Sequence, residues 1–160
     1  MITVVLPTRN SAARLVHVLP LLVPAAVDGL VKAVVFADAD STDATLEIAE
    51  DSGARVVQDL GDAGARLAAG CGAAKSPWVF ALGEDLVLPD GWRTSVEAHL
   101  AGAGATGKPA FIAAPGLFGR PLAVLVRLDA IEAAGGFKPG GDPLKTLLAK
   151  LKARASRLKA

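Results

Sequence analysis

The sequence predicts an α/β fold in which a mainly parallel central sheet is flanked by helices. Short apolar runs alternate along the chain with longer stretches of helical periodicity, as expected for βαβ units. Crossover connections between parallel strands are right-handed, so these units build an open sheet with helices on its faces. A length of 160 residues suits one domain. We therefore expect residues 1–160 to fold as a single unit.

Six apolar runs are short enough for strands and are followed by polar or turn-forming residues. The first, "ITVVLP", leads into "PTRN". The second, "LVKAVVFA", leads into "DADSTD", and the fourth, "WVFALG", leads into "GED". In chain order, the expected strands cover residues 2–7, 30–37, 54–58, 78–83, 110–114 and 122–127.

Helical stretches separate these runs. Asn10 or Ser11 is a suitable N-cap for the first helix, and Pro24 disfavours its continuation beyond about residue 22. The second has acids in its first turn and Gly53 at its end, as the helix dipole and C-cap preferences favour. The expected helices cover residues 11–22, 42–53, 63–74 and 92–100, a short segment ending at 135–136, and the tail from residue 143. Residues 101–109 are expected to form a flexible loop.

Composition excludes several functional classes. The chain has 17 basic and 16 acidic residues, a balance that argues against a nucleic-acid partner. The single cysteine, Cys71, excludes an internal disulfide and a cysteine-based zinc cluster. The N-terminus lacks the pattern of a signal peptide, and the longest apolar window, residues 15–27, is too short to span a bilayer. We expect a cytoplasmic protein.

The C-terminal tail is basic. From Lys138 onward there are seven basic residues and one acid, which leaves ten basic and fifteen acidic residues in the rest of the chain. If the tail is one helix, its leucines form an apolar stripe that packs on the domain. Its basic face would then contact anionic lipid at the inner surface of the membrane. Peripheral membrane attachment through this helix is thus an alternative to purely cytoplasmic localisation.

Three polar segments follow the first, second and fourth expected strands: "PTRN", "DADSTD" and "GEDLVLPDGW". Open parallel sheets bind ligands beyond the carboxyl ends of their strands. The three segments are therefore expected to meet at one edge of the sheet and to form a ligand site there.

The order and spacing of "VVLPTRN", "DADSTDAT", "FALGEDLVLPDGW", "AAGGF" and "GGD" resemble family 2 glycosyltransferases, across residues 2–151. The resemblance implies a Rossmann-like GT-A fold and an enzyme that uses a nucleotide-diphosphate sugar and an acceptor of unknown identity. Four positions depart from the usual family pattern, namely Ser11, Ala68, Gly83 and Gly141. The chain resembles a short and partly degenerate member.

The resemblance implies a nucleotide site at the first two segments. Residues 7–10 match the loop that lies against the nucleotide, and Asp38 matches the acid that contacts the base. A carboxylate is a suitable acceptor for an N–H on the base edge. The alternative is that Asp38 only caps the following helix, a role that we expect for Asp43. The four nucleotide-loop residues are Pro7, Thr8, Arg9 and Asn10.

The resemblance also implies a metal site. Asp85 matches the second acid of the family's Asp-x-Asp motif, and Gly83 stands where the first acid is usual. A carboxylate with diphosphate oxygens suits Mg²⁺ or Mn²⁺. Glu84 is a further candidate ligand, although strand alternation points it away from the site. Alternatively, Asp85 is an ordinary turn acid.

Four further residues complete the site that the resemblance implies. Arg66 matches a phosphate-contacting position, although a solvated surface arginine is the alternative. Gly135 and Gly136 match the acceptor-side loop, where glycine permits close approach of a sugar. Asp142 matches the general base that takes a proton from the acceptor hydroxyl. The alternative for Asp142 is an N-cap followed by a proline.

Two other functions fit the same sequence. A degenerate GT-A domain would bind a nucleotide or a protein partner without catalysis. A nucleotidyltransferase of similar fold usually has a glycine-rich phosphate loop after its first strand, and "PTRNSAARL" has no glycine.

Overall fold

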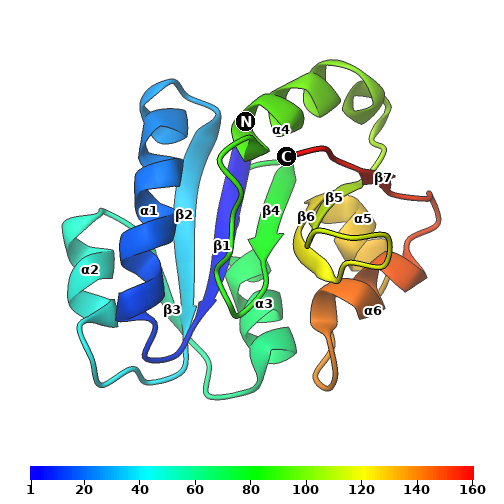
Figure 1. Ribbon diagram of the computed structural model, residues 1–160. Helices are drawn as coiled ribbons and strands as arrows, with labels where there is room; N and C mark the ends of the chain where they lie inside the picture. Colours follow the sequence, from blue (N-terminus) through cyan, green and yellow to red (C-terminus); the bar gives the residue numbers. More distant parts are fainter.

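The computed structural model describes all 160 residues and contains one seven-stranded sheet in the order β3-β2-β1-β4-β6-β5-β7 (Figure 1). Strands β1 to β4 form a parallel block. Strand β6 is antiparallel to β4 and β5, whereas β7 is parallel to β5. The predicted α/β fold with a mainly parallel sheet is confirmed. The strands are β1 (Ile2–Thr8), β2 (Val31–Asp38), β3 (Arg55–Gln58), β4 (Trp78–Leu82), β5 (Ala110–Ala113), β6 (Pro121–Arg127) and β7 (Ser156–Arg157).

Helices cover both faces of this sheet. Successive residues of a strand point to opposite faces, so a buried strand contributes side chains to an apolar core on each side. Leu6 of β1 belongs to an apolar core shared with α1, α2 and α4, and its neighbour Val5 belongs to a second core shared with α3, α5 and α6. The expected helices are therefore present, and a short 3₁₀ turn lies within residues 101–109. The helices are α1 (Ala12–Val27), α2 (Thr45–Asp51), α3 (Ala63–Gly72), α4 (Trp92–Ala101), η1 (Ala103–Thr106), α5 (Leu128–Ala133) and α6 (Pro143–Lys150).

Helix α1 continues through two prolines to Val27, so the expected end near residue 22 is wrong. Pro20 and Pro24 are one helical turn apart and exposed, which places them on the outer face of the helix. Each proline removes one N–H donor. Because this face is exposed, water can bond the carbonyl groups that lose their intrahelical partners.

Helix α2 begins at Thr45, three residues later than expected. The backbone N–H of Ser41 donates to Asp38 at 2.9 Å, and that of Thr42 donates to Asn10 at 2.8 Å. These side-chain acceptors hold residues 41 and 42 in a loop against the end of β1, so the helix begins after them. The loop after β2 is thus built by the polar residues of the first two sequence segments.

The tail is not one helix. Helix α6 ends at Lys150, and β7 then adds an edge strand beside β5. Leu158 packs against the core, and the Arg157 guanidinium donates to the carbonyl groups of Ala114 and Gly116. The expectation that the tail is one continuous helix is therefore wrong, and contact of its basic residues with anionic lipid stays a prediction. None of the helices has both the length and the apolar character needed to cross a membrane.

Candidate functional site

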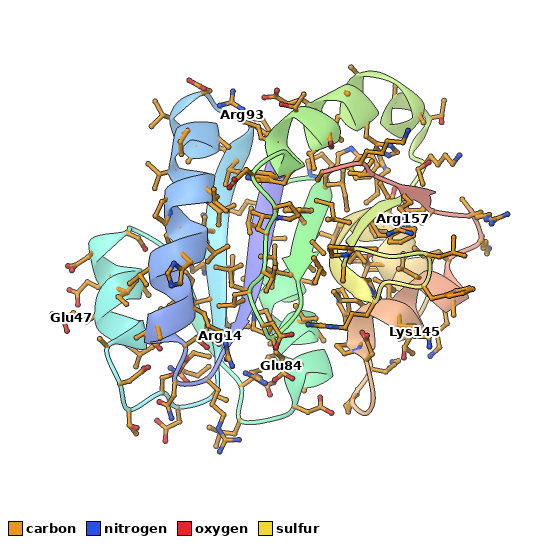
Figure 2. The ribbon with its side chains drawn as sticks, viewed as in Figure 1. Arg14, Glu47, Glu84, Arg93, Lys145 and Arg157 are labelled. Atoms are coloured by element: carbon orange, nitrogen blue, oxygen red, sulfur yellow. The ribbon has the colours of Figure 1, made fainter.

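The carboxyl ends of β1, β2 and β4 lie at one edge of the sheet, which is the lower edge in Figure 1. Thr8 at the end of β1 stands in register with Asp38 at the end of β2. Figure 2 shows Glu84, which follows β4, at the same edge, whereas Arg93 of α4 lies at the opposite edge. The three polar segments therefore converge as the sequence predicts.

Asp38 lies at the centre of a buried hydrogen-bond network. Its Oδ1 accepts hydrogen bonds from the hydroxyl groups of Thr8 (2.7 Å) and Ser41 (2.6 Å), and its Oδ2 accepts one from the Ser41 N–H (2.9 Å). The Asp38 side chain is 0% exposed. In this geometry the carboxylate fixes the loop after β2 against the end of β1, and none of it reaches the surface.

Asn10 and Asp43 join the loop after β1 to the loop after β2. Asn10 has a positive φ of 46°, and its side-chain oxygen accepts the N–H of Thr42. Asp43 accepts the N–H groups of Ala12 and Thr45, which are the first residues of α1 and α2. The Thr45 hydroxyl also donates to Asp43 and is the main reason that the pKa of this carboxyl lies below its usual value. The helix-terminus role predicted for Asp43 is confirmed.

Arg66 of α3 is buried, so the surface alternative for this residue is wrong. Its Nη1 donates to the carbonyl oxygen of Thr8 at 2.8 Å, and its Nη2 forms an ion pair with Glu84. The prediction that Glu84 points away from the site is also wrong. Arg66 thereby ties the end of β1 to the segment after β4, and its Nε has no hydrogen-bond partner within the chain.

A cavity of about 300 Å³ lies beyond the end of β4. Asp85 and Asp142 both line it, although they are far apart in the sequence. The Asp85 carboxylate forms an ion pair with Arg120, which precedes β6 and lines the same cavity. The candidate metal ligand and the candidate base are thus brought to one cavity. Its full lining is Ala63, Gly83, Glu84, Asp85, Arg120, Pro121, Gly141, Asp142, Pro143 and Leu144.

Asp142 is the N-cap of α6. Its Oδ1 accepts the N–H groups of Leu144 and Lys145, both at 3.1 Å, and Pro143 occupies the first turn. The capping alternative is therefore observed. The other oxygen, Oδ2, accepts no hydrogen bond within the chain, so capping occupies only one oxygen of this carboxylate.

The remaining candidate residues, Pro7, Arg9, Gly135 and Gly136, do not line this cavity. Pro7 is buried in β1, and the Arg9 side chain is exposed beyond it. Gly135 and Gly136 have positive φ values of 86° and 74° and follow α5, where the Gly136 N–H donates to the Ile131 carbonyl at 2.8 Å. Neither glycine lines the cavity, so their role on the acceptor side stays a prediction.

Sequence reasoning missed two charged residues at this edge. Arg120 gives no local signal, because its partner Asp85 lies 35 residues earlier. Asp62 caps α3 at the Ala65 N–H (3.0 Å) and also accepts the Gly140 N–H (2.6 Å). These two bonds, the Ala65 one first, lower the pKa of Asp62. The position of Asp62 before a helical stretch could have identified the cap, but not the contact with the loop before α6.

A larger cavity, of about 690 Å³, lies beside the C-terminal tail. Its lining is mostly apolar, with Leu122 and Leu158 among its residues, and includes no acid. It offers neither a metal ligand nor a base, so we place the candidate site at the smaller cavity.

Comparisons with known proteins identify the fold. Residues 3–107 match the family model of glycosyl transferase family 2. The chain is similar to glucosyl-3-phosphoglycerate synthase from Mycobacterium tuberculosis in complex with Mn²⁺, uridine diphosphate and glucosyl-3-phosphoglycerate, with a TM-score of 0.75 and 21% identity over 99% of this chain and 70% of that chain. No curated protein has a significantly similar sequence.

The chain is also similar to S. aureus TarS in complex with UDP-GlcNAc, with a TM-score of 0.72 and 19% identity over 98% of this chain and 55% of that chain. The chain thus spans little more than half of the solved TarS chain, which comprises residues 1–349. The likeness to both structures confirms the expected GT-A fold.

Proposed function

The chain belongs to glycosyl transferase family 2, and we propose that it transfers a sugar from a nucleotide-diphosphate sugar to a hydroxyl group of an acceptor. The proposal rests mainly on one observation: Asp85 and Asp142 line the same cavity at the carboxyl end of β4. Its volume of about 300 Å³ lies at the lower end of the range for small-molecule sites. A sugar held there would have its diphosphate near Asp85 and its acceptor near Asp142.

The nucleotide is proposed to lie against the loops after β1 and β2. Arg9 is exposed there and has no acidic partner, so its guanidinium is available for a phosphate. Asp38 is fully buried, and direct contact with a nucleobase N–H requires the loop after β2 to shift. We therefore assign to Asp38 the support of this loop, with direct base contact as the alternative.

A divalent metal is proposed to bind at Asp85. The Asp85 side chain is 49% exposed and supplies a hard oxygen, but no group of three or more His, Cys, Asp or Glu side chains is placed to hold an ion. These residues fit an ion that takes most of its ligands from phosphate and water, as Mg²⁺ or Mn²⁺ does. When bound, such an ion offsets negative charge on the leaving diphosphate.

Asp142 is proposed as the general base. The N–H groups of Leu144 and Lys145 hold its Oδ1, which fixes the direction of the free Oδ2. Oδ2 accepts the proton of the acceptor hydroxyl while the hydroxyl oxygen forms a bond to the anomeric carbon. The bond from that carbon to the diphosphate oxygen breaks, and its electron pair leaves with the nucleoside diphosphate. Attack opposite the leaving group inverts the configuration of the anomeric carbon.

A second candidate function is nucleotide binding without transfer. Two observations favour it: Gly83 stands in place of an acid that the family usually has, and Arg120 neutralises the remaining acid, Asp85. A domain of this kind would retain the loops after β1 and β2 and lose the metal-dependent step.

The test is a calorimetric titration with UDP and other nucleoside diphosphates, each with and without Mn²⁺, followed by incubation with nucleotide-sugars and a panel of hydroxyl-bearing acceptors and assay of released nucleoside diphosphate. Transferase function predicts binding that Mn²⁺ strengthens and release of nucleoside diphosphate from at least one nucleotide-sugar. Binding without release supports the second candidate. No binding under any condition rejects both.

A further inference from the structure

The proposed metal ligand already has a cationic partner. Nη2 of Arg120 pairs with Oδ2 of Asp85, and both side chains line the cavity that also contains Asp142. The antiparallel pairing of β4 and β6 creates this contact, because Asp85 follows the end of β4 and Arg120 precedes the start of β6. A metal ion that approaches Asp85 must therefore compete with a guanidinium.

Arg120 is the one positively charged side chain in an otherwise acidic cavity lining. Three lining residues are acids, Glu84, Asp85 and Asp142, and Arg120 is the one basic residue. The Arg66 guanidinium beneath them is already committed to Glu84 and to the Thr8 carbonyl. A diphosphate that enters this cavity is repelled by the acids and finds one lining side chain of opposite charge, that of Arg120.

The two arginine–carboxylate pairs at this edge differ in burial. In the Arg66–Glu84 pair the arginine side chain is 4% exposed, whereas in the Arg120–Asp85 pair the side chains are 53% and 49% exposed. Pairs between exposed side chains are weak, because water solvates both charges. The Arg120–Asp85 pair is thus the one that can break at little cost.

We propose that Arg120 is a phosphate-binding residue that pairs with Asp85 in the free protein and moves to the diphosphate when nucleotide binds. The movement releases Asp85 to the metal, so nucleotide prepares the metal site. A guanidinium suits this exchange, because its planar fork bonds carboxylate and phosphate oxygens equally well and phosphate carries the greater charge. The inference rests on the proposed function, since it requires a diphosphate in this cavity.

Reciprocity gives the exchange a measurable consequence. If nucleotide frees Asp85, nucleotide and metal strengthen each other's binding by the same factor. Direct contact between metal and phosphate contributes to the same coupling. A variant without Arg120 keeps the direct contact between metal and phosphate but loses both the competitor for Asp85 and the partner for the diphosphate. The difference in coupling between wild type and variant is therefore the contribution of Arg120.

The experiment compares the wild type with Arg120→Ala and Arg120→Lys, and uses Arg127→Ala as the control. Arg127 is an exposed, ion-paired arginine at the other end of β6, so its loss changes the net charge equally but leaves the cavity intact. Three dissociation constants are measured for each protein: Mn²⁺ alone by electron paramagnetic resonance of the free ion, UDP alone in the presence of EDTA, and UDP with Mn²⁺. Circular dichroism melting confirms that each variant folds.

We expect Arg120→Ala to bind Mn²⁺ alone about 2- to 5-fold more tightly, the share of a weak competing pair. It should bind UDP without metal about 10- to 150-fold more weakly, as expected for loss of a charge-assisted hydrogen bond. Arg120→Lys keeps the charge but lacks the planar guanidinium, so its affinities for Mn²⁺ and UDP should lie between those of the wild type and Arg120→Ala. Arg127→Ala should have the affinities of the wild type.

The possible failures are distinct. If Arg120→Ala matches Arg127→Ala in both Mn²⁺ and metal-free UDP affinity, the exchange is wrong while the proposed function stands. If Arg120→Ala weakens Mn²⁺ binding, Arg120 supports the metal site and the competition is wrong. If the wild type binds no UDP under any condition, the proposed function fails and the exchange fails with it.

Discussion

The hydroxyl group of Thr8 donates a 2.7 Å hydrogen bond to Oδ1 of Asp38, so side chains join the last residues of β1 and β2 in addition to the parallel ladder. The same oxygen accepts the Ser41 hydroxyl at 2.6 Å. The buried carboxylate therefore sets the position of the loop after β2. A residue that the sequence marks as a ligand contact also has a structural task, and the two tasks call for separate measurements.

Loss of the Asp38 carboxylate should lower stability. Asp38→Ala leaves the Thr8 and Ser41 hydroxyl groups and the Ser41 N–H without their acceptor, which should cost about 1–3 kcal/mol in the free energy of unfolding. Urea unfolding measures this cost. The control is Asp40→Asn, which removes an exposed acid from the same loop, retains a side chain that tolerates the positive φ of 51°, and should change stability by no more than about 0.5 kcal/mol.

Nucleotide affinities of Asp38→Asn separate base contact from loop support. If Asp38 supports the loop, the variant should bind UDP and other nucleoside diphosphates more weakly by a common factor. Direct contact with the base predicts a loss that differs between bases, because each base edge presents different N–H groups. A loss confined to one base would overturn the support assignment.

Neighbouring acids should differ in their effect on stability. Glu84 and Asp85 are adjacent and each pairs with an arginine, but the partner of Glu84 is buried and the partner of Asp85 is exposed. Glu84→Ala leaves the buried Arg66 guanidinium without a counter-charge and should cost about 1–3 kcal/mol. Asp85→Ala leaves Arg120 to water and should cost about 1 kcal/mol or less. If urea unfolding gives the same loss of stability for Glu84→Ala and Asp85→Ala, the burial of the arginine partner does not determine the cost of removing the acid.

The strands and most helices follow from local patterns, because apolar periodicity and capping residues act over a few positions. The end of α6 does not. The leucines of the tail continue a helical stripe, yet Leu158 packs against the core from the segment after β7 and Arg157 bonds the loop after β5. These contacts join residues about 40 positions apart, and tertiary contacts of that kind override local helical preference.

The candidate site divides in the same way. Asp38 and Asp85 follow strands whose parallel order places them at one edge, so their convergence is predictable from the alternation of elements. The burial of Arg66 and the pairing of Arg120 with Asp85 depend on packing between α3, β4 and β6. The hydrophobic periodicity of a sequence does not predict such contacts between elements. Such packing decides which charged residue is structural and which is available to a ligand.

Acid should reduce the contribution of Asp43 to stability. The pKa of Asp43 is lowered from 3.8, chiefly by the Thr45 hydroxyl, so the folded state favours the ionised carboxylate. Its contribution is fully present above pH 3.8, the unfolded value, and is lost as the pH falls through the lower folded pKa. Asp43→Ala should cost about 1 kcal/mol at pH 7, as is usual for a lost cap.

The measurement for Asp43 is urea unfolding of wild type and Asp43→Ala at pH 7 and at several values below 4. The difference between them should stay constant down to about pH 4 and narrow below it. Asp51→Asn, at the other end of α2, removes an acid that makes no side-chain hydrogen bond and should show no loss of stability at pH 7. A difference that widens in acid would contradict the assigned direction of the pKa shift.

Transfer should depend on Asp142, while folding should not. Asp142→Asn keeps a side-chain oxygen for the N–H groups of Leu144 and Lys145, so the start of α6 is retained. The amide cannot take the acceptor's proton, and loss of general-base catalysis should lower kcat by about 10²- to 10⁴-fold with little change in the affinity for nucleotide-sugar. The control is Asp62→Asn, which alters a neighbouring N-cap that also holds the loop before α6 but lies outside the cavity lining. It should retain most of the rate.

Rates come from nucleoside diphosphate release in the presence of acceptor, and affinities from calorimetry. If Asp142→Asn retains the wild-type rate, another group takes the proton. If Asp62→Asn loses as much rate as Asp142→Asn, the loss reflects the position of α6 and not proton transfer to Asp142.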